Sequence, residues 1–107
     1  MKIKNLWFEF DEWENGFDET DANTDVHFEL DDGTKWCASF YTYQNLLTLS
    51  QKNKKTGECL SGEYFYAPKP IFISRISKEL IVSVLEDIIL TESELSSVFT
   101  RISPSLT

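Results

Sequence analysis

Residues 25–43 read DVHFELDDGTKWCASFYTY, and this stretch decides the fold. Apolar and polar residues alternate on both sides of the DDG sequence, which is the pattern of two half-buried strands joined by a turn. A three-residue turn that ends at Gly33 places the apolar partners of both strands on one face, whereas a two-residue turn would mix the two faces. The expected pairs are Leu30 with Thr34, Phe28 with Trp36, and Val26 with Ala38. We therefore predict a β-hairpin in which Gly33 adopts the left-handed backbone conformation.

The segments on either side of the hairpin predict more strands and helices. Ser77 is a suitable N-cap, and the apolar residues that follow it recur at helical spacing as far as Leu90. Thr91 and Glu94 form a T-x-x-E capping box, which predicts that another helix begins there. We expect strands over 3–10, 64–66 and 71–76, and helices over 44–55, 77–90 and 92–101.

This order of elements predicts a single α+β domain over residues 1–107, with residues 103–107 as a frayed tail. The expected architecture is an antiparallel β-sheet with helices packed on one face. A chain of 107 residues can bury a core without metal ions or disulfides, so we expect Cys37 and Cys59 to be reduced thiols. No apolar run approaches the roughly 18 residues that span a bilayer, and the N-terminal residues turn acidic before a secretory signal could form. The resulting expectation is a cytoplasmic protein that does not bind membranes.

Negative charge is concentrated in the first third of the sequence. Residues 1–32 hold 11 acidic residues and two lysines, a formal charge of −9, whereas the whole chain carries −8. Such a surface repels a phosphate backbone, which argues against nucleic-acid binding. It attracts a basic protein and speeds its approach. We therefore expect a non-enzymatic, acidic protein-interaction module that uses no cofactor and binds a basic protein partner.

The candidate protein-binding residues lie in and beside the polar loop that precedes the hairpin. Two large aromatic residues occur there among the carboxylates, and aromatic anchors beside charged groups are typical of protein interfaces. Their rings either pin the loop to the core or form part of the contact surface. The predicted protein-binding residues are Trp13, Phe17, Asp18, Glu19, Asp21 and Asp25.

A calcium-binding loop is a weaker interpretation of the same segment. Asp21, Asn23 and Asp25 match the opening D-x-N-x-D of an EF-hand loop, but Val26 stands where that loop needs glycine for its sharp turn. Residues 26–30 also alternate as a strand, which a metal loop would not do. We therefore predict no metal site here.

Two further functions stay open. His27 shares its predicted face with Cys37 and Ser39, but one imidazole, one thiol and one hydroxyl on an open surface form no recognised catalytic motif. A small-ligand-binding protein or an enzyme would need a pocket between the sheet and the helices that gathers such groups. A homodimer through an open sheet edge or the last helix is the other alternative.

The middle of the chain, within residues 28–68, resembles small bacterial proteins of unassigned function. In those proteins a D-G hairpin precedes a helix start of the form T-Y-x-N-[IL], and a G-E-x-L-x-G-x-Y-F segment follows. The matching residues here are Asp32 and Gly33, the sequence TYQNL at 42–46, and the segment 57–65. Some small acidic bacterial proteins of this size are similar to immunity partners of secreted toxins. The resemblance implies an immunity-like protein that binds a basic toxin, and it assigns no catalytic residue.

Overall fold

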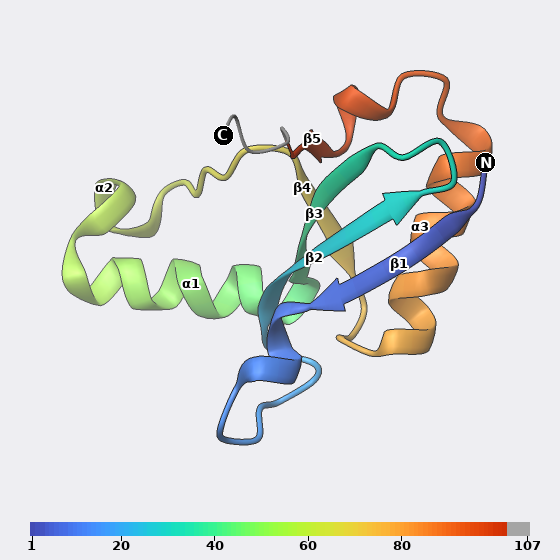
Figure 1. Cartoon of the computed structure of the whole chain (residues 1–107). Coiled ribbons are helices and arrows are strands. Elements are labelled where there is room, and N and C mark those ends of the chain that lie inside the picture. Colours follow the sequence, from blue (N-terminus) through green and yellow to red (C-terminus); the bar gives the residue numbers. More distant parts are fainter. Residues whose placement is uncertain (103–107) are drawn as a thin grey trace, which may run out of the picture.

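The computed structural model describes residues 1–102, and the tail expected at 103–107 lies outside the described residues. Its sheet has five strands. Four follow one another in the spatial order β1 (Ile3–Phe8), β2 (Asn23–Leu30), β3 (Lys35–Thr42) and β4 (Pro70–Ile73), and the fifth, β5 (Thr100–Arg101), also pairs with β3 (Figure 1). The pairs β1–β2, β2–β3 and β3–β5 are antiparallel, whereas β3–β4 is parallel. The strand expected over 71–76 is thus present but ends early, at Ile73.

Three helices accompany the sheet, and the predicted α+β fold class is confirmed. They are α1 (Tyr43–Thr56), the short α2 (Glu58–Gly62) and α3 (Lys78–Thr91), with 3-10 turns at Glu9–Glu12 and Leu95–Ser97. Helix α3 lies along the sheet, whereas α1 continues from β3 and extends away from it (Figure 1). The connection through α1 and α2 lets β4 run parallel to β3, because parallel neighbours need a long crossover. None of the described helices is long and apolar enough to cross a bilayer.

Strands β2 and β3 form the predicted hairpin. Phe28 pairs with Trp36 and Val26 pairs with Ala38, which confirms the register expected from a three-residue turn. Gly33 has a φ angle of +86°, the left-handed conformation that glycine adopts without steric cost. Since side chains alternate along a strand, the polar residues between these apolar ones face the other side of the sheet.

Helix α3 packs on the apolar face of the hairpin, as the sequence predicts. Ser77 caps the helix by accepting a hydrogen bond from the N–H of Leu80 at 3.1 Å. Ile81 and Leu85 are completely buried in the same core as the apolar residues of the hairpin. Burying one such side chain contributes about 1.5–3 kcal/mol, so the contact between α3 and the sheet is a main source of stability. The core also contains Phe8, Val26, Phe28, Leu30, Ala38, Phe40, Ile71, Ile73 and Ile76.

Helix α1 buries little apolar surface because it extends beyond the sheet. The Thr42 hydroxyl caps its first turn by accepting a hydrogen bond from the N–H of Asn45, and Gly57 ends it with a φ angle of +85°. The buried residues of α1 are both polar, Asn45 and Asn53, while Leu47 is 53% exposed. The helix therefore depends on its caps and on the segment that folds back against it more than on the main core.

The segment called α2 is a left-handed turn that folds back on α1. Residues 59–61 have φ angles between +51° and +55°, although none of them is glycine. This conformation costs L-amino acids roughly 1–2 kcal/mol per residue. Gly62 follows with a φ angle of +82°, and a Cβ atom there would lie 2.5 Å from the carbonyl oxygen of Ser50. The close approach of the turn to α1 therefore requires glycine at this position.

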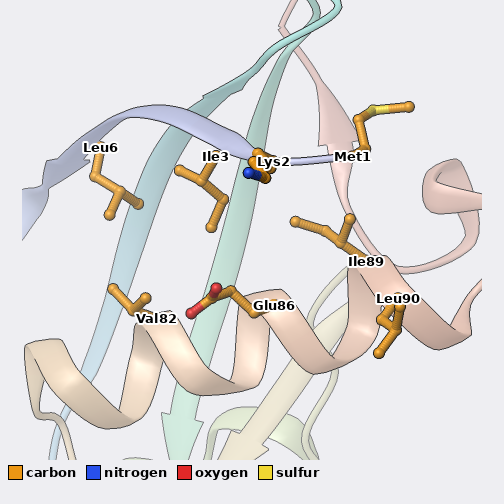
Figure 2. Close-up of a pocket in the computed structure, with 8 residues that line it drawn as sticks. All are labelled: Met1, Lys2, Ile3, Leu6, Val82, Glu86, Ile89 and Leu90. Atoms are coloured by element: carbon orange, nitrogen blue, oxygen red, sulfur yellow. The ribbon is translucent and has the colours of Figure 1, made fainter.

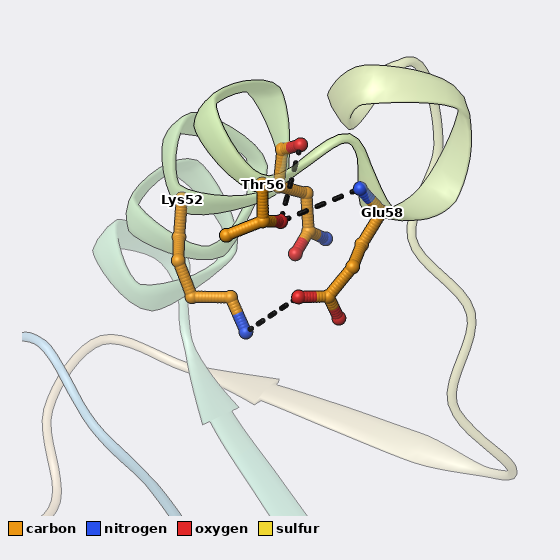
Figure 3. A network of polar contacts seen from close by, with 4 residues as sticks. Lys52, Thr56 and Glu58 are labelled. Carbon is orange, nitrogen blue, oxygen red and sulfur yellow. Dashed lines mark hydrogen bonds and ion pairs between the residues drawn. The ribbon is translucent and has the colours of Figure 1, made fainter.

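Polar contacts at the end of α1 fix the start of this turn (Figure 3). The Thr56 hydroxyl accepts a hydrogen bond from the N–H of Glu58 at 3.3 Å and donates one to the carbonyl oxygen of Asn53 at 3.5 Å. Lys52 and Glu58 form an ion pair at 3.8 Å, but both side chains are more than half exposed. An exposed ion pair of this kind contributes little to stability. The hydrogen bonds of Thr56 and the glycines therefore do more to fix the shape of the turn.

The prediction of a helix over 92–101 is wrong. The hydroxyl of Thr91 donates to the carbonyl oxygen of Asp87 inside α3 instead of opening a capping box. Beyond α3 the chain makes a short 3-10 turn and then pairs with β3 as β5. Phe99 gives the physical reason, because its ring is completely buried and meets Phe28 edge-on with the ring centroids 4.9 Å apart. This tertiary contact outweighs the weak helix preference of a serine-rich segment.

The prediction of a strand over 64–66 is also wrong. These residues form an irregular segment in which Tyr64 is 54% and Tyr66 is 78% exposed. The edge of β3 that faces away from β2 is occupied by β4 at one end and by β5 at the other. The aromatic segment therefore finds no free edge of β3 with which to pair, and its strand propensity stays unused.

Candidate functional site

Aromatic rings hold the loop between β1 and β2, residues 9–22, which we call the acidic loop. Strand β1 ends at Phe8, two residues earlier than expected, and a 3-10 turn follows. The ring of Phe10 lies 6.2 Å from that of Trp13 and 5.5 Å from that of Phe17, measured between centroids. Trp13 and Phe17 meet edge-on at 4.9 Å, and both are half-buried. Phe10 and Phe17 pack against the core, and Trp13 packs on both of these rings. The rings thus pin the loop to the core, which is one of the two alternatives that the sequence left open.

Asp21 ties the acidic loop to α1. Its carboxylate accepts hydrogen bonds from the side-chain amide of Asn45 at 3.0 Å and from the hydroxyl of Thr48 at 2.7 Å. Asn45 in turn accepts a hydrogen bond from the side chain of Asn23 at 2.9 Å. Hydrogen bonds to charged groups contribute about 1.5–3 kcal/mol each. Asp21 therefore positions the loop, and both of its carboxylate oxygens are occupied by donors from the chain itself.

Asp25 lies where the acidic loop meets the sheet. Its side chain is on the face opposite the core and accepts a hydrogen bond from the hydroxyl of Ser39 at 2.8 Å. Its backbone N–H donates to the carboxylate of Glu9 at 3.1 Å. Two carboxylates therefore lie close together at this junction and join the charge of the loop to that of the sheet.

Asp18 and Glu19 present their side chains to solvent. The carboxylate of Asp18 accepts hydrogen bonds from the hydroxyl of Thr20 at 2.6 Å and from its N–H at 2.9 Å, and these bonds lower the pKa of Asp18. The backbone carbonyl of Glu19 accepts a hydrogen bond from the N–H of Ile76 at 2.7 Å, which fixes the loop and leaves the side chain free. The exposed carboxylates of the acidic loop are Asp11, Glu12, Glu14, Asp18 and Glu19.

The acidic residues of the first third do not form one patch. Asp31 and Asp32 belong to the hairpin turn, which lies at the opposite end of β2 from the acidic loop (Figure 1). There the hydroxyl and N–H of Thr34 bind the carboxylate of Asp32 and lower its pKa. The acidic loop holds seven of the 11 acids in residues 1–32, so it remains the larger concentration of negative charge.

The sheet face opposite α3 carries aromatic side chains that are not among the six predicted protein-binding residues. Trp7 packs on His27 with the ring centroids 4.8 Å apart and remains 41% exposed, and Phe72 is 47% exposed. Tyr41 meets Phe65 edge-on at 5.6 Å. One signal was available for Trp7, which is out of phase with the apolar residues on either side of it. We call this surface the open face, made of Trp7, Asp25, His27, Tyr41, Phe65 and Phe72.

Cys37 and His27 are paired neighbours on β3 and β2, but their surroundings do not build a nucleophile. Burial, followed by the negative charges of Asp25 and Glu9, raises the pKa of the Cys37 thiol to about 11. Such a thiol is almost entirely protonated at neutral pH and therefore reacts slowly. The hydroxyl of Ser39 donates to Asp25 directly, without a histidine between them, so the order of groups in a catalytic triad is not present.

The residues of the calcium-loop pattern are engaged elsewhere. Asp21 and Asp25 accept hydrogen bonds from α1 and β3, and Val26 is completely buried in β2. Within residues 1–102, no three His, Cys, Asp or Glu side chains are placed to hold a metal ion. The strand therefore occupies the part of the sequence where a metal loop would have to turn.

Among residues 1–102, two hollows are considered as ligand sites because of their size. The larger, of about 490 Å³, lies between β1 and α3 and is lined mainly by apolar side chains (Figure 2). The second, of about 370 Å³, lies on the sheet beside Trp7 and His27. Neither hollow includes Cys37 or gathers more than one carboxylate. The second hollow does gather the polar side chains of Asn5, His27, Glu29 and Lys35. The side-chain amide of Asn5 already donates to the Glu29 carboxylate at 2.7 Å, and no cysteine or serine is among the lining residues of either hollow.

Comparison with known proteins adds no assignment: no family model, no curated protein and no solved structure matches this chain. A function must therefore be argued from the charge and geometry of the chain itself. The acidic loop and the open face are the two features that carry such an argument.

Proposed function

We propose that this chain is a non-enzymatic, acidic protein-interaction module that binds a basic protein. The observation that carries the proposal is the open face, where Trp7 and Phe72 stay 41% and 47% exposed on the same side of the sheet as the carboxylate of Asp25. The solvent face of an antiparallel sheet is ordinarily polar. Large aromatic rings left there are suited to serve as anchors in a protein interface, because binding removes much apolar surface from water.

Charge determines which kind of partner fits. The acidic loop adjoins the open face at Glu9 and Asp25, so the aromatic rings have carboxylates at one end of the surface. These carboxylates favour lysine and arginine on a partner and speed its approach, and salt should weaken both effects. Asp18 stays ionised to a lower pH than an ordinary aspartate, because its hydrogen bonds to Thr20 lower its pKa.

The predicted binding residues take different roles in this proposal. Asp18 and Glu19 would contact the partner directly, because their side chains are exposed. Trp13, Phe17 and Asp21 would act indirectly by holding the acidic loop in one shape. A loop that is already ordered loses less conformational entropy on binding, and its affinity is correspondingly higher.

An immunity-like protein that neutralises a basic toxin is the more specific form of the proposal. A toxin that acts on nucleic acid needs a basic surface for its phosphate substrate. An acidic module that covers this surface would block the toxin without performing any reaction. The small size and acidic charge of the chain, which are similar to those of immunity partners of secreted toxins, suggest this version. A toxin gene beside the gene for this chain would support it further.

A small-ligand-binding protein or an enzyme has weaker support. The alternative needs a hollow that gathers reactive groups, but Cys37 and Ser39 lie outside both hollows. The high pKa of the Cys37 thiol also removes the strongest nucleophile of the open face at neutral pH. The interaction module therefore accounts for more of the described features.

Affinity capture from the native host, followed by calorimetry with the purified partner, tests the proposal. The loop variant Glu12→Gln/Glu14→Gln/Glu19→Gln removes three exposed charges from the acidic loop. The matched control Asp31→Asn/Glu63→Gln/Asp87→Asn removes the same charge from exposed residues elsewhere. A third variant, Trp7→Ala, removes one anchor from the open face.

We expect the captured partner to be basic and its affinity to fall as salt rises. The loop variant and Trp7→Ala should each weaken binding by about tenfold or more, whereas the control triple should change it by less than about threefold. A partner that binds all three variants equally well would contradict the proposed surface. Binding that does not respond to salt would contradict the proposed chemistry of the partner.

A further inference from the structure

Strand β1 is an edge strand whose outer side has no partner. Strand β2 covers one side, and within residues 1–102 no strand pairs with the other. The register with β2 shifts between Ile3 and Asn5 and then continues without interruption to Phe8. An edge strand presents unpaired N–H and C=O groups to solvent, and these groups pair readily with another extended chain. The regular part of this edge is therefore a ready site for one more strand.

An apolar groove runs beside this edge, between β1 and α3 (Figure 2). Ile3 and Leu6 point from the strand toward the helix, and Val82 and Ile89 point from the helix toward the strand. The rim stays open to solvent, with Leu6 36% and Leu90 85% exposed. The groove measures about 490 Å³. A strand added to β1 would cover this apolar rim as well as the free backbone groups.

The charges along β1 indicate which kind of strand can pair with its free edge. Lys2 and Lys4 lie at its start, and Glu9 and Glu12 follow its end. In the part of the chain that the structure describes, neither lysine forms an ion pair. A second copy of β1 laid antiparallel places the lysines of each copy beside the carboxylates of the other, at both ends of the pair. A parallel arrangement would bring like charges together, which is unfavourable.

We propose that a second copy of this chain binds here, so that two β1 strands pair antiparallel across a two-fold axis near Leu6. The same surface serves both copies, which is the requirement for a closed symmetric dimer. The two sheets become one continuous sheet, and the apolar rims of both grooves are buried. The two acidic loops lie at opposite ends of the pair, which limits their mutual repulsion. The open faces remain uncovered, so this proposal does not depend on the proposed basic partner.

Light scattering after gel filtration tests the proposal on the full chain, over about 1–300 μM protein, because dimerisation depends on concentration. The wild type should approach twice the chain mass of 12.4 kDa at the upper end of this range. Leu6→Lys places a charge at the two-fold axis and should raise the dimer dissociation constant by more than about tenfold. Leu47→Lys is the matched control, because Leu47 is also exposed but lies on α1.

A charge exchange makes the test independent of the apolar contact. Lys2→Glu should raise the dissociation constant by about tenfold, because Lys2 lies opposite Phe10 and near Glu12 of the other copy. Lys2→Glu/Glu12→Lys should restore most of the affinity. Lys55→Glu on α1 is the control for a change of net charge alone. Circular dichroism of every variant checks that the fold is retained. A wild type that stays monomeric at the highest concentration would overturn the proposal, and so would Leu47→Lys weakening the dimer as much as Leu6→Lys.

Discussion

Replacing Phe99 by alanine tests how the C-terminal part of the described chain stabilises the fold. The Phe99 ring is completely buried, and its centroid lies 4.9 Å from that of Phe28 and 6.5 Å from that of Trp36. Truncating a buried phenylalanine to alanine typically costs about 3–5 kcal/mol, because the apolar surface is lost and a cavity remains. Both aromatic contacts disappear as well, so we expect the free energy of unfolding to fall by about 4 kcal/mol. A domain of this size has only about 5–15 kcal/mol in total, so the loss is large.

Urea denaturation followed by circular dichroism measures this change in the free energy of unfolding. Tyr66→Ala is the control, because Tyr66 is 78% exposed and the same kind of truncation there should cost less than about 0.5 kcal/mol. Unfolding should stay cooperative in both variants, with the midpoint of Phe99→Ala at clearly lower urea. A cost below about 1 kcal/mol for Phe99→Ala would refute the place of this ring in the core.

Two further predictions concern Gly62 and Cys37. Gly62→Ala should lower the free energy of unfolding by about 1–3 kcal/mol in thermal melting, because Gly62 has a φ angle of +82° and an added Cβ would meet the Ser50 carbonyl at 2.5 Å. Gly16→Ala, with nothing within 4 Å of its added Cβ, should change it little; equal effects would contradict the close approach. With its pKa raised to about 11, Cys37 should be ionised in only about one molecule in a thousand at pH 8. In a Cys59→Ser background, mass spectrometry should therefore show iodoacetamide modifying Cys37 far more slowly than an unfolded control, with a rate that rises about tenfold per pH unit; modification as fast as in urea would contradict this.

The hairpin and α3 could be predicted from sequence because local features determine them. Alternation of apolar residues fixes which side of each strand faces the core and therefore the length of the turn, and Gly33 supplies the left-handed residue that a three-residue turn needs. The segment after α3 could not be predicted in this way. The structure of this segment depends on the contact of Phe99 with Phe28 and Trp36, which lie far earlier in the chain. A local sequence pattern does not indicate such a contact.

The candidate site could likewise be predicted only in part from the sequence. That the side chains of Asp18 and Glu19 would be exposed follows from their place in a polar loop. The structural role of Asp21 does not follow, because it depends on Asn45 and Thr48 arriving from α1. Trp7 could have been placed on the open face from its phase in β1, but the absence of a covering element there is a property of the whole fold.

The pairing of β5 with β3 also limits when the fold can be completed during synthesis. Strands β2 and β3 are adjacent in sequence and can pair early, because domains fold as their residues leave the ribosome. Phe99 and β5 are made long after the strands that they cover. A product that stops before residue 99 would leave Phe28 and Trp36 without their covering ring. Such a fragment would expose an apolar sheet surface and become a substrate for chaperones and proteases, rather than a slightly shorter working protein.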